Sequence, residues 1–259
     1  MYAFDELWKS LSAWKIWLHI GLDDVVGRYR RTILGPIWIV ISQCAFIFGL
    51  WLVRHSIAGT DDNKYLLYLS VSIPTWNLIA AFLNEGSNAL LRSKGYIESY
   101  PLPLPIFIIR TVAAAVVNFL HLLVVYVVIA GVTQSFPITP MILLFFPAIC
   151  LVILFGVGIS LALATLGARF RDLGPAIASL VALMFVLTPV FWIPTEAQLH
   201  SLIVQLNPFY YFLEIVREPL LGTAISAHAW GTAGLITSVT LVFGGVVYKL
   251  LRPSIVYWL

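Results

Sequence analysis

Apolar residues follow one another along this chain in uncharged stretches of about twenty, separated by shorter polar segments. Residues 33–53 form the first, 21 residues without Asp, Glu, Lys or Arg. As a helix this stretch is about 31 Å long at roughly 1.5 Å per residue, which matches a hydrocarbon core of about 30 Å. The pattern predicts a helix that spans a membrane.

The same pattern recurs to the end of the chain. No charged residue occurs from Thr111 to Ala168, enough for two crossings, and the Pro-containing segment 133–140 marks the turn between them. The predicted spans are 33–53, 65–84, 106–131, 141–167, 174–192 and 230–248. No linker or repeat separates them, so residues 1–259 are predicted to form a single all-α transmembrane domain with six membrane-spanning helices.

The composition supports this class. Of the 259 residues, 61% are hydrophobic and 10% are charged, whereas soluble domains are about half apolar. The net charge of +3 does not imply a nucleic-acid partner. Cys44 and Cys150 lie within apolar runs, where a thiol acts as a small hydrophobic group, so neither a disulfide nor a metal site is predicted.

Residues 188–222 are too apolar for an ordinary loop and too often interrupted by Pro, Glu and Arg for a simple crossing. If residues 195–222 form a re-entrant helix pair between spans five and six, the basic residues divide twelve against three between the two sides. The first side holds Lys9, Lys15, Arg28, Arg30, Arg31, Arg92, Lys94, Arg110, Arg169, Arg171, Lys249 and Arg252, and the second holds Arg54, Lys64 and Arg217. A full crossing would weaken this division, so we predict the re-entrant pair, with both termini cytoplasmic. A backbone that enters and leaves on one face must lie in protein or beside water, which suggests a pore.

Residues 1–30 carry a different pattern. Phe4, Leu7, Trp8 and Leu11 recur at spacings of three and four, with polar residues between them, which predicts an amphipathic helix at the membrane interface. Arg28, Arg30 and Arg31 follow it. Such a cluster anchors a helix end to lipid phosphates, or it binds the phosphate or pyrophosphate of a ligand.

The longest predicted cytoplasmic connection covers residues 85–110. Its segment from Tyr100 to Pro105 contains three prolines, which prevent a continuous helix. A short helix around residues 93–100 followed by a stiff elbow is expected. Such a knob is a surface that a soluble partner could press on.

Three segments resemble one family. RYRRTILGPIWIVI at residues 28–41, GARFRDLGPAI at 167–177, and LTPVFWIP with LNPFYYFLEIVREPLLG between residues 187 and 222 are similar to the membrane subunits of type 2 ATP-binding-cassette exporters. The resemblance is closest to exporters of O-antigen, capsule and teichoic acid chains. It implies a homodimer with the export channel at its interface, an amphipathic gate helix at residues 1–30, and a coupling helix at 93–100.

The energy source lies outside this chain. The chain contains no Gly-Lys dipeptide, so the phosphate-binding loop of ATPases is absent. The resemblance implies two copies of a separate cytoplasmic ATPase subunit, which bind the ATP and Mg²⁺, while this chain itself carries no cofactor. The candidate coupling residues are Arg92, Lys94, Tyr96, Glu98 and Tyr100.

The expected function is export of an undecaprenyl-linked, O-antigen-like polysaccharide across a bacterial inner membrane. Alternative cargoes are capsular polysaccharide, teichoic acid or a small hydrophobic compound, and a membrane enzyme on lipid-linked sugars is the alternative from another class. That enzyme would need a concentrated set of acids, histidines or metal ligands, which the sequence lacks, so no catalytic residue is predicted.

The remaining site residues follow from this expectation. Aromatic side chains suit sugar rings that slide through a channel, but they are also enriched at any membrane interface. Helix spacing favours pairing of Glu214 with Arg217. The candidates are Arg28, Arg30 and Arg31 for the substrate pyrophosphate or lipid headgroup; Trp38, Phe191, Trp192, Phe209, Tyr210 and Tyr211 for the channel or gate; and Glu214, Arg217 and Glu218 for a periplasmic gate.

Overall fold

A computed structural model of the chain describes residues 2–29, 32–35, 37–58, 63–137 and 139–259, without the side chains of residues 2–4, 28, 29 and 58. All regular secondary structure in these ranges is helical. The elements are α1 (Tyr2–Ser12), α2 (Trp14–Tyr29), α3 (Ile37–Ala58), α4 (Asn63–Ser87), α5 (Ala89–Arg92), α6 (Lys94–Ser99), α7 (Pro105–Val132), the 3-10 helix η1 (Pro140–Leu144), α8 (Phe145–Arg169), α9 (Leu173–Leu187), α10 (Glu196–Leu199), α11 (Leu202–Gln205), α12 (Pro208–Leu221) and α13 (Ala227–Trp258).

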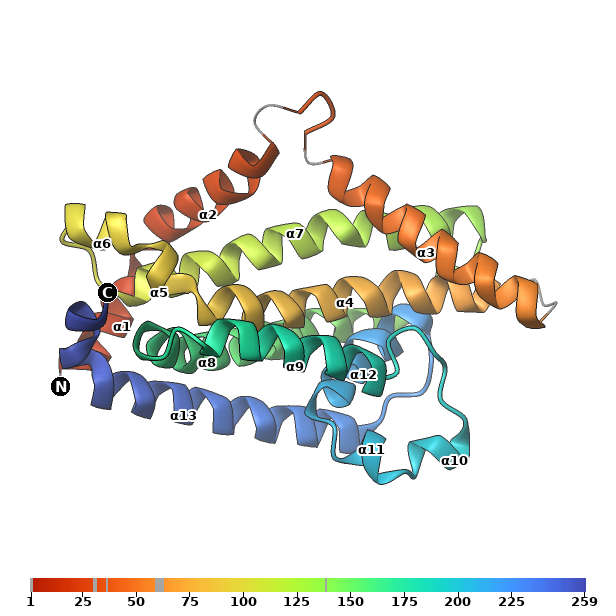
Figure 1. The fold of residues 1–259 in the computed structure, drawn as a ribbon. Helices are drawn as coiled ribbons and strands as arrows, with labels where there is room; N and C mark the ends of the chain where they lie inside the picture. The colour runs from red at the N-terminus through yellow and green to blue at the C-terminus, as the bar shows by residue number, and fades with distance from the viewer. Residues whose placement is uncertain (1, 30–31, 36, 59–62, 138) are drawn as a thin grey trace.

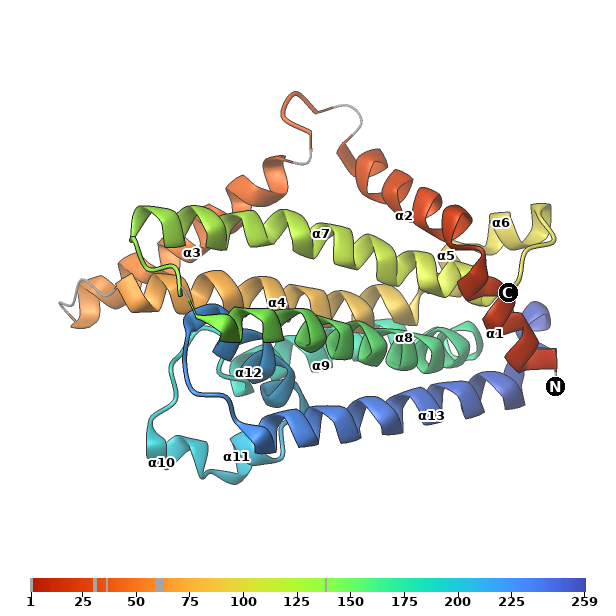
Figure 2. The same ribbon diagram turned by 180° about the vertical axis from the view of Figure 1, so that it is seen from behind.

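The long helices lie side by side in an elongated bundle (Figures 1 and 2). Both chain termini lie at one end of it, next to α1, α5 and α6, and we call this the terminal end. The short helices α10 and α11 lie at the opposite end, which we call the far end. The chain therefore begins and ends on the same side of the bundle.

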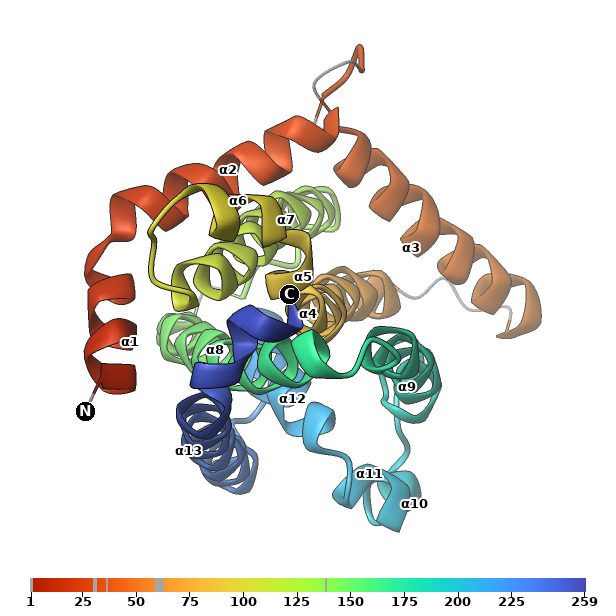
Figure 3. The ribbon, with the colours of Figure 1, turned by 60° about the vertical axis from the view of Figure 1, so that its left-hand side comes forward.

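Helix α4 occupies the centre of the bundle, enclosed by α7, α8, α9 and α12, while α1, α2 and α3 form an outer arc (Figure 3). In α4, 78% of an apolar 18-residue stretch is buried in the protein, against 11% in α3. Apolar surface as exposed as that of α3 is stable in an apolar surrounding. The burial difference therefore separates a core helix from a peripheral one of similar apolar character.

Glycines allow α8 and α13 to pack closely along the bundle. A Cβ atom added to Gly158 would lie 2.7 Å from the backbone nitrogen of Leu241, and one added to Gly244 would collide with the carbonyl oxygen of Gly158. Small residues at such crossings let helix backbones approach one another in membrane proteins. This pairing holds the C-terminal helix against the rest of the bundle.

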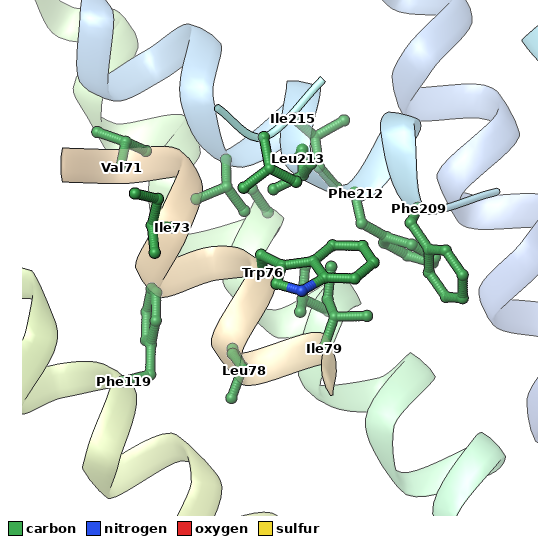
Figure 4. Close-up of a cluster of buried hydrophobic side chains, with 14 of the residues drawn as sticks. Val71, Ile73, Trp76, Leu78, Ile79, Phe119, Phe209, Phe212, Leu213 and Ile215 are labelled. Carbon is green, nitrogen blue, oxygen red and sulfur yellow. The ribbon is translucent and has the colours of Figure 1, made fainter. Parts of the chain in front are cut away.

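Aromatic side chains fix α12 in the core near the far end (Figure 4). The ring centroids of Trp76 on α4 and Phe209 on α12 are 5.7 Å apart at an interplanar angle of 87°, an edge-to-face contact. The ring centroids of Phe212 and of Phe155 in α8 are 4.4 Å apart. Helix α12 is therefore packed into the bundle on two sides.

Five helical segments in the described residues are long and apolar enough to cross a membrane: Ile37–Ile57, Asn63–Ser87, Pro105–Val132, Pro140–Arg169 and Ala227–Trp258. The prediction of an all-α, multi-pass membrane protein is confirmed. The remaining predicted span, 174–192, corresponds to α9, which has only 15 residues. It ends because Thr188 adopts an extended backbone before Pro189, as a residue preceding proline favours. The count of six crossings stays a prediction.

The N-terminal segment forms two helices where the sequence pattern suggested one. Helix α1 packs near α7 and α13, whereas α2 packs along α7, where a Cβ on Gly21 would lie 3.0 Å from the carbonyl oxygen of Arg110. From this contact α2 leans away from the bundle, and α3 returns toward the far end (Figure 1). Two different docking surfaces therefore divide the segment near Ala13.

Candidate functional site

Helix α12 has clear start and stop signals. The side-chain oxygen of Asn207 accepts a hydrogen bond from the backbone N–H of Phe209 at 3.0 Å, and Pro208 occupies the first turn. Gly222 ends the helix in the left-handed conformation, with φ of 67°. Asn207 also donates to the hydroxyl oxygen of Thr188 at 2.7 Å, which ties α12 to the end of α9.

A buried arginine lies in the middle of α12. Arg217 is 4% exposed, and its Nη2 donates to Glu214 Oε2 at 3.0 Å. Its Nη1 donates to the carbonyl oxygen of Pro189 at 3.1 Å and reaches the Ser72 hydroxyl at 3.5 Å. The guanidinium carbon lies 4.5 Å from the centre of the Tyr68 ring. This one side chain thus links α12, the turn after α9, and α4.

Tyrosines of α4 hold the turn after α9 in place. The Tyr68 hydroxyl donates to the carbonyl oxygens of Pro189 at 2.6 Å and Trp192 at 2.9 Å, and the Tyr65 hydroxyl donates to that of Phe191 at 2.6 Å. These bonds satisfy carbonyl groups that a non-helical turn leaves unpaired. The turn is therefore fixed to the core helix.

Glu218 completes the far-end cluster, which we define as Tyr68, Glu214, Arg217 and Glu218. It is 3% exposed, and its Oε1 accepts a hydrogen bond from the backbone N–H of Ser226 at 2.9 Å, while its Oε2 has no hydrogen-bond partner in the described ranges. Burial, and next the nearby Glu214 carboxylate, raise the pKa of Glu218 to about 7. The far-end cluster borders a cavity of about 390 Å³.

At the terminal end, a single carboxylate joins three segments. Arg252 of α13 donates to both oxygens of Glu6 in α1, from Nε at 2.7 Å and from Nη2 at 2.9 Å. The Tyr248 hydroxyl and the backbone N–H of Leu104 donate to the same carboxylate, at 2.9 and 3.2 Å. Burial alone would raise the pKa of Glu6, but the hydrogen bonds from Arg252 and Tyr248 outweigh it, and the pKa is lowered.

Helices α5 and α6 form a projecting knob at the same end (Figure 1). No residue of α6 is buried, and Tyr96 and Tyr100 are about half exposed. Lys94 Nζ lies 3.8 Å from Glu98 Oε1 on the solvated face, a distance typical of a weak surface ion pair. Of the five predicted coupling residues, all lie on or directly beside this knob.

A second buried arginine lies beneath the knob. Arg110 in α7 is 5% exposed, and its Nη2 donates a hydrogen bond to the Ser93 hydroxyl oxygen at 3.0 Å. Its Nε lies 3.7 Å from Asp24 Oδ2, and neither Nε nor Nη1 has a hydrogen-bond partner among the described residues. The guanidinium carbon lies 5.2 Å from the centre of the Tyr96 ring. Arg110 entered the sequence prediction only through the charge count for topology, although a charge inside an apolar helix is costly and marks a functional candidate.

The aromatic candidates fall into different environments. Phe209 and Tyr211 are buried in the core of this protomer, Phe191, Trp192 and Tyr210 are half-buried at the far end, and Trp38 is exposed on α3. Their role in a channel stays a prediction. The side chain of Arg28, together with Arg30 and Arg31, lies outside the described residues.

Comparisons with known proteins agree with this helical architecture. The family model described as ABC-2 type transporter matches residues 22–221 of the chain. An O-antigen export system permease protein RfbA from Myxococcus xanthus is 22% identical over 71% of this chain and 72% of its own length. Two proteins of the same name from Klebsiella pneumoniae are each 23% identical, over 65% and 75% of this chain and 65% and 76% of their own lengths.

Proposed function

Since the chain belongs to the ABC-2 type transporter family, we propose that it is the permease of an exporter that carries a lipid-linked, O-antigen-like polysaccharide across a bacterial inner membrane. The family makes the chain a transport subunit, and the sequence has no phosphate-binding loop of its own. The observation that carries the choice of cargo is the similarity to three permeases named for O-antigen export.

The partner that supplies energy is an ATPase subunit, because ABC-2 permeases pair with such subunits. In our proposal two permease chains form a homodimer and two ATPase copies bind ATP and Mg²⁺ in the cytoplasm. The knob formed by α5 and α6 is the docking surface. Its exposure and its attachment to α7 through the bond between Arg110 and Ser93 support this role.

In the proposed topology the terminal end is cytoplasmic and the chain crosses the membrane six times, with α9 as the fifth crossing. Helices α10, α11 and α12 enter and leave on the periplasmic face as a re-entrant gate. The placement of both termini at one end of the bundle supports this topology, because a full crossing between α9 and α13 would separate them (Figure 1).

Cysteine labelling tests the topology. In a background with Cys44→Ser and Cys150→Ser, single cysteines at Gln198 and Thr223 should both react with a membrane-impermeant maleimide from outside intact cells. A cysteine at Glu98 on the knob should react only after the membrane is opened. Cytoplasmic labelling at Thr223 would overturn the six-crossing arrangement.

The substrate headgroup is proposed to meet Arg28, Arg30 and Arg31, since guanidinium groups suit pyrophosphate oxygens. Replacing all three with Gln should impair export while membrane insertion and dimerisation persist. Normal export from this variant would remove the assignment, and the same substitution at Arg169 and Arg171 is a control that removes two positive charges from another loop.

Deletion of the chain tests the function itself. Undecaprenyl-linked polymer should accumulate in the cytoplasm, and expression of the intact chain should restore export. The sugar composition of the accumulated lipid distinguishes O-antigen from capsule or teichoic acid. Unchanged levels of every undecaprenyl-linked polymer in the deletion strain would contradict the proposal.

A further inference from the structure

The cavity beneath the knob has the chemistry of a ligand site. It has a volume of about 330 Å³, and we call it the terminal cavity. Three parts of the fold enclose it: α2, the α4–α6 segment and the start of α7. Its lining residues are Asp24, Glu85, Ala89, Arg92, Tyr96, Arg110, Thr111 and Ala114.

Arg110 gives the terminal cavity unused hydrogen-bond donors. The side chain is more than nine-tenths buried, and within the part of the chain that the structure describes its Nε and Nη1 have no hydrogen-bond partner. A buried polar group without a partner is costly, so such donors are usually satisfied by a ligand or an ordered water. In Arg217, by contrast, both terminal nitrogens have partners within the protein.

The charges around the terminal cavity indicate what kind of ligand fits. Two cations, Arg92 and Arg110, and two carboxylates, Asp24 and Glu85, line it, so their formal charges cancel. A phosphate in this space would gain two guanidinium contacts but face both carboxylates. A sugar hydroxyl both donates and accepts, so a neutral sugar can use the carboxylates as well as the guanidinium groups.

Two further features suit a sugar. The Tyr96 ring lines the cavity and offers an apolar face to a pyranose. A second hollow, of about 210 Å³, also has Glu85 in its wall together with the amides of Asn77 and Asn118. Asn118 Oδ1 is buried without a hydrogen-bond partner. Polar groups therefore continue from the terminal cavity along α4 and α7 toward the far end.

We propose that the terminal cavity binds a sugar unit of the saccharide, with Arg110 and Arg92 donating to its hydroxyl oxygens and with Asp24 and Glu85 accepting from its hydroxyl groups. This inference rests on the proposed export of a glycan and assigns the residues that select it. The site lies within one protomer and is built from α2, the α4–α6 segment and α7.

Direct binding tests the site. The probe is an oligosaccharide of two to four units, released by mild hydrolysis from the host's own surface polysaccharide. Saturation-transfer NMR on the full-length permease with its ATPase, in lipid nanodiscs, should detect binding. Inorganic phosphate and glycerol phosphate at equal concentration should not displace the probe.

Variants separate this site from a general effect of charge. Arg110→Lys and Glu85→Gln should each weaken probe binding about tenfold, the loss expected for one buried charge-assisted hydrogen bond. Lys249→Gln, an exposed charge on α13, should leave binding unchanged. Thermal unfolding identifies any variant that does not fold, and Arg92→Gln at the exposed rim then takes its place.

The outcomes distinguish the two proposals. Absence of probe binding, equal binding by wild type and the cavity variants, or displacement by phosphate would overturn the sugar site. If the sugar site is overturned but the deletion strain accumulates undecaprenyl-linked polymer, the proposed glycan export is kept and only this site is lost. If the deletion strain accumulates no such polymer, the proposed function fails, whatever the binding result.

Discussion

Two buried arginines, one at each end of the bundle, differ in how their guanidinium groups are satisfied. Arg217 donates to a carboxylate at 3.0 Å and a backbone carbonyl at 3.1 Å, and it lies over the Tyr68 ring. Among the residues that the structure describes, Arg110 makes one hydrogen bond, has a carboxylate at 3.7 Å, and keeps two nitrogens without hydrogen-bond partners. Both residues are about 95% buried.

This difference separates an arginine that holds the fold together from one that can bind a ligand. The partners of Arg217 come from its own helix, from the turn after α9 and from α4, so its removal disconnects segments of the fold. Arg110 joins α7 to the knob through one hydrogen bond. The rest of its guanidinium group lines the terminal cavity of about 330 Å³. Burial of an arginine alone therefore does not indicate a ligand site. The number of its N–H donors that already have partners in the protein does.

The largest expected effect is that of Arg217→Leu. The substitution leaves the half-buried Glu214 without its cation and removes one of the two donors to the Pro189 carbonyl oxygen, a loss of about 3 kcal/mol or more. Thermal unfolding of the purified chain, followed by tryptophan fluorescence, should show a strongly lowered midpoint. Wild-type stability in this variant would contradict the structural role of Arg217, and Lys249→Leu at an exposed position is the control.

Tyr68→Phe removes the hydroxyl that holds the turn after α9. The carbonyl oxygen of Trp192 loses the Tyr68 donor and that of Pro189 keeps the bond from Arg217, so the free energy of unfolding should fall by about 1–2 kcal/mol. The same assay measures it, with Tyr100→Phe on the exposed knob as the matched control. Equal stability of the two variants would show that the turn does not depend on this bond.

Arg110→Leu should cost less stability than either change at the far end. The substitution removes one hydrogen bond, to Ser93, the long contact with Asp24 and the guanidinium contact with the Tyr96 ring, and Asp24 stays partly solvated, so the expected loss is about 1 kcal/mol. Probe binding should nevertheless disappear. A destabilisation as large as that of Arg217→Leu would remove the contrast between the two arginines.

A separate prediction concerns the pH dependence of stability at the far end. The pKa of Glu218 is raised from 4.5 to about 7, so the folded state binds a proton more tightly than the unfolded state between these values. Stability should fall as the pH rises from 4.5 to 7. The unfolding midpoint measured across this window should vary less in Glu218→Gln than in wild type, and identical profiles would contradict the raised pKa.

Local features of the site were predictable, whereas its long-range partners were not. The pairing of Glu214 with Arg217 follows from their spacing of three on a helix, and the structure confirms it at 3.0 Å. The contact of Arg217 with Ser72 joins residues 145 positions apart, which no spacing rule anticipates. The short helix α6 was also predictable, because the prolines that follow it end a helix through local backbone geometry.

The sequence by itself determined the membrane class, the helical segments and the absence of an ATP-binding loop, because apolar run length, proline positions and motifs are local properties. Only the tertiary structure decided which apolar helix is central and which is peripheral, since α3 and α4 are both long apolar helices and differ in burial only after packing. It also decided that Arg217 is satisfied and Arg110 is not. The hydrogen-bond partners of a buried cation come from distant segments, and packing alone brings these together.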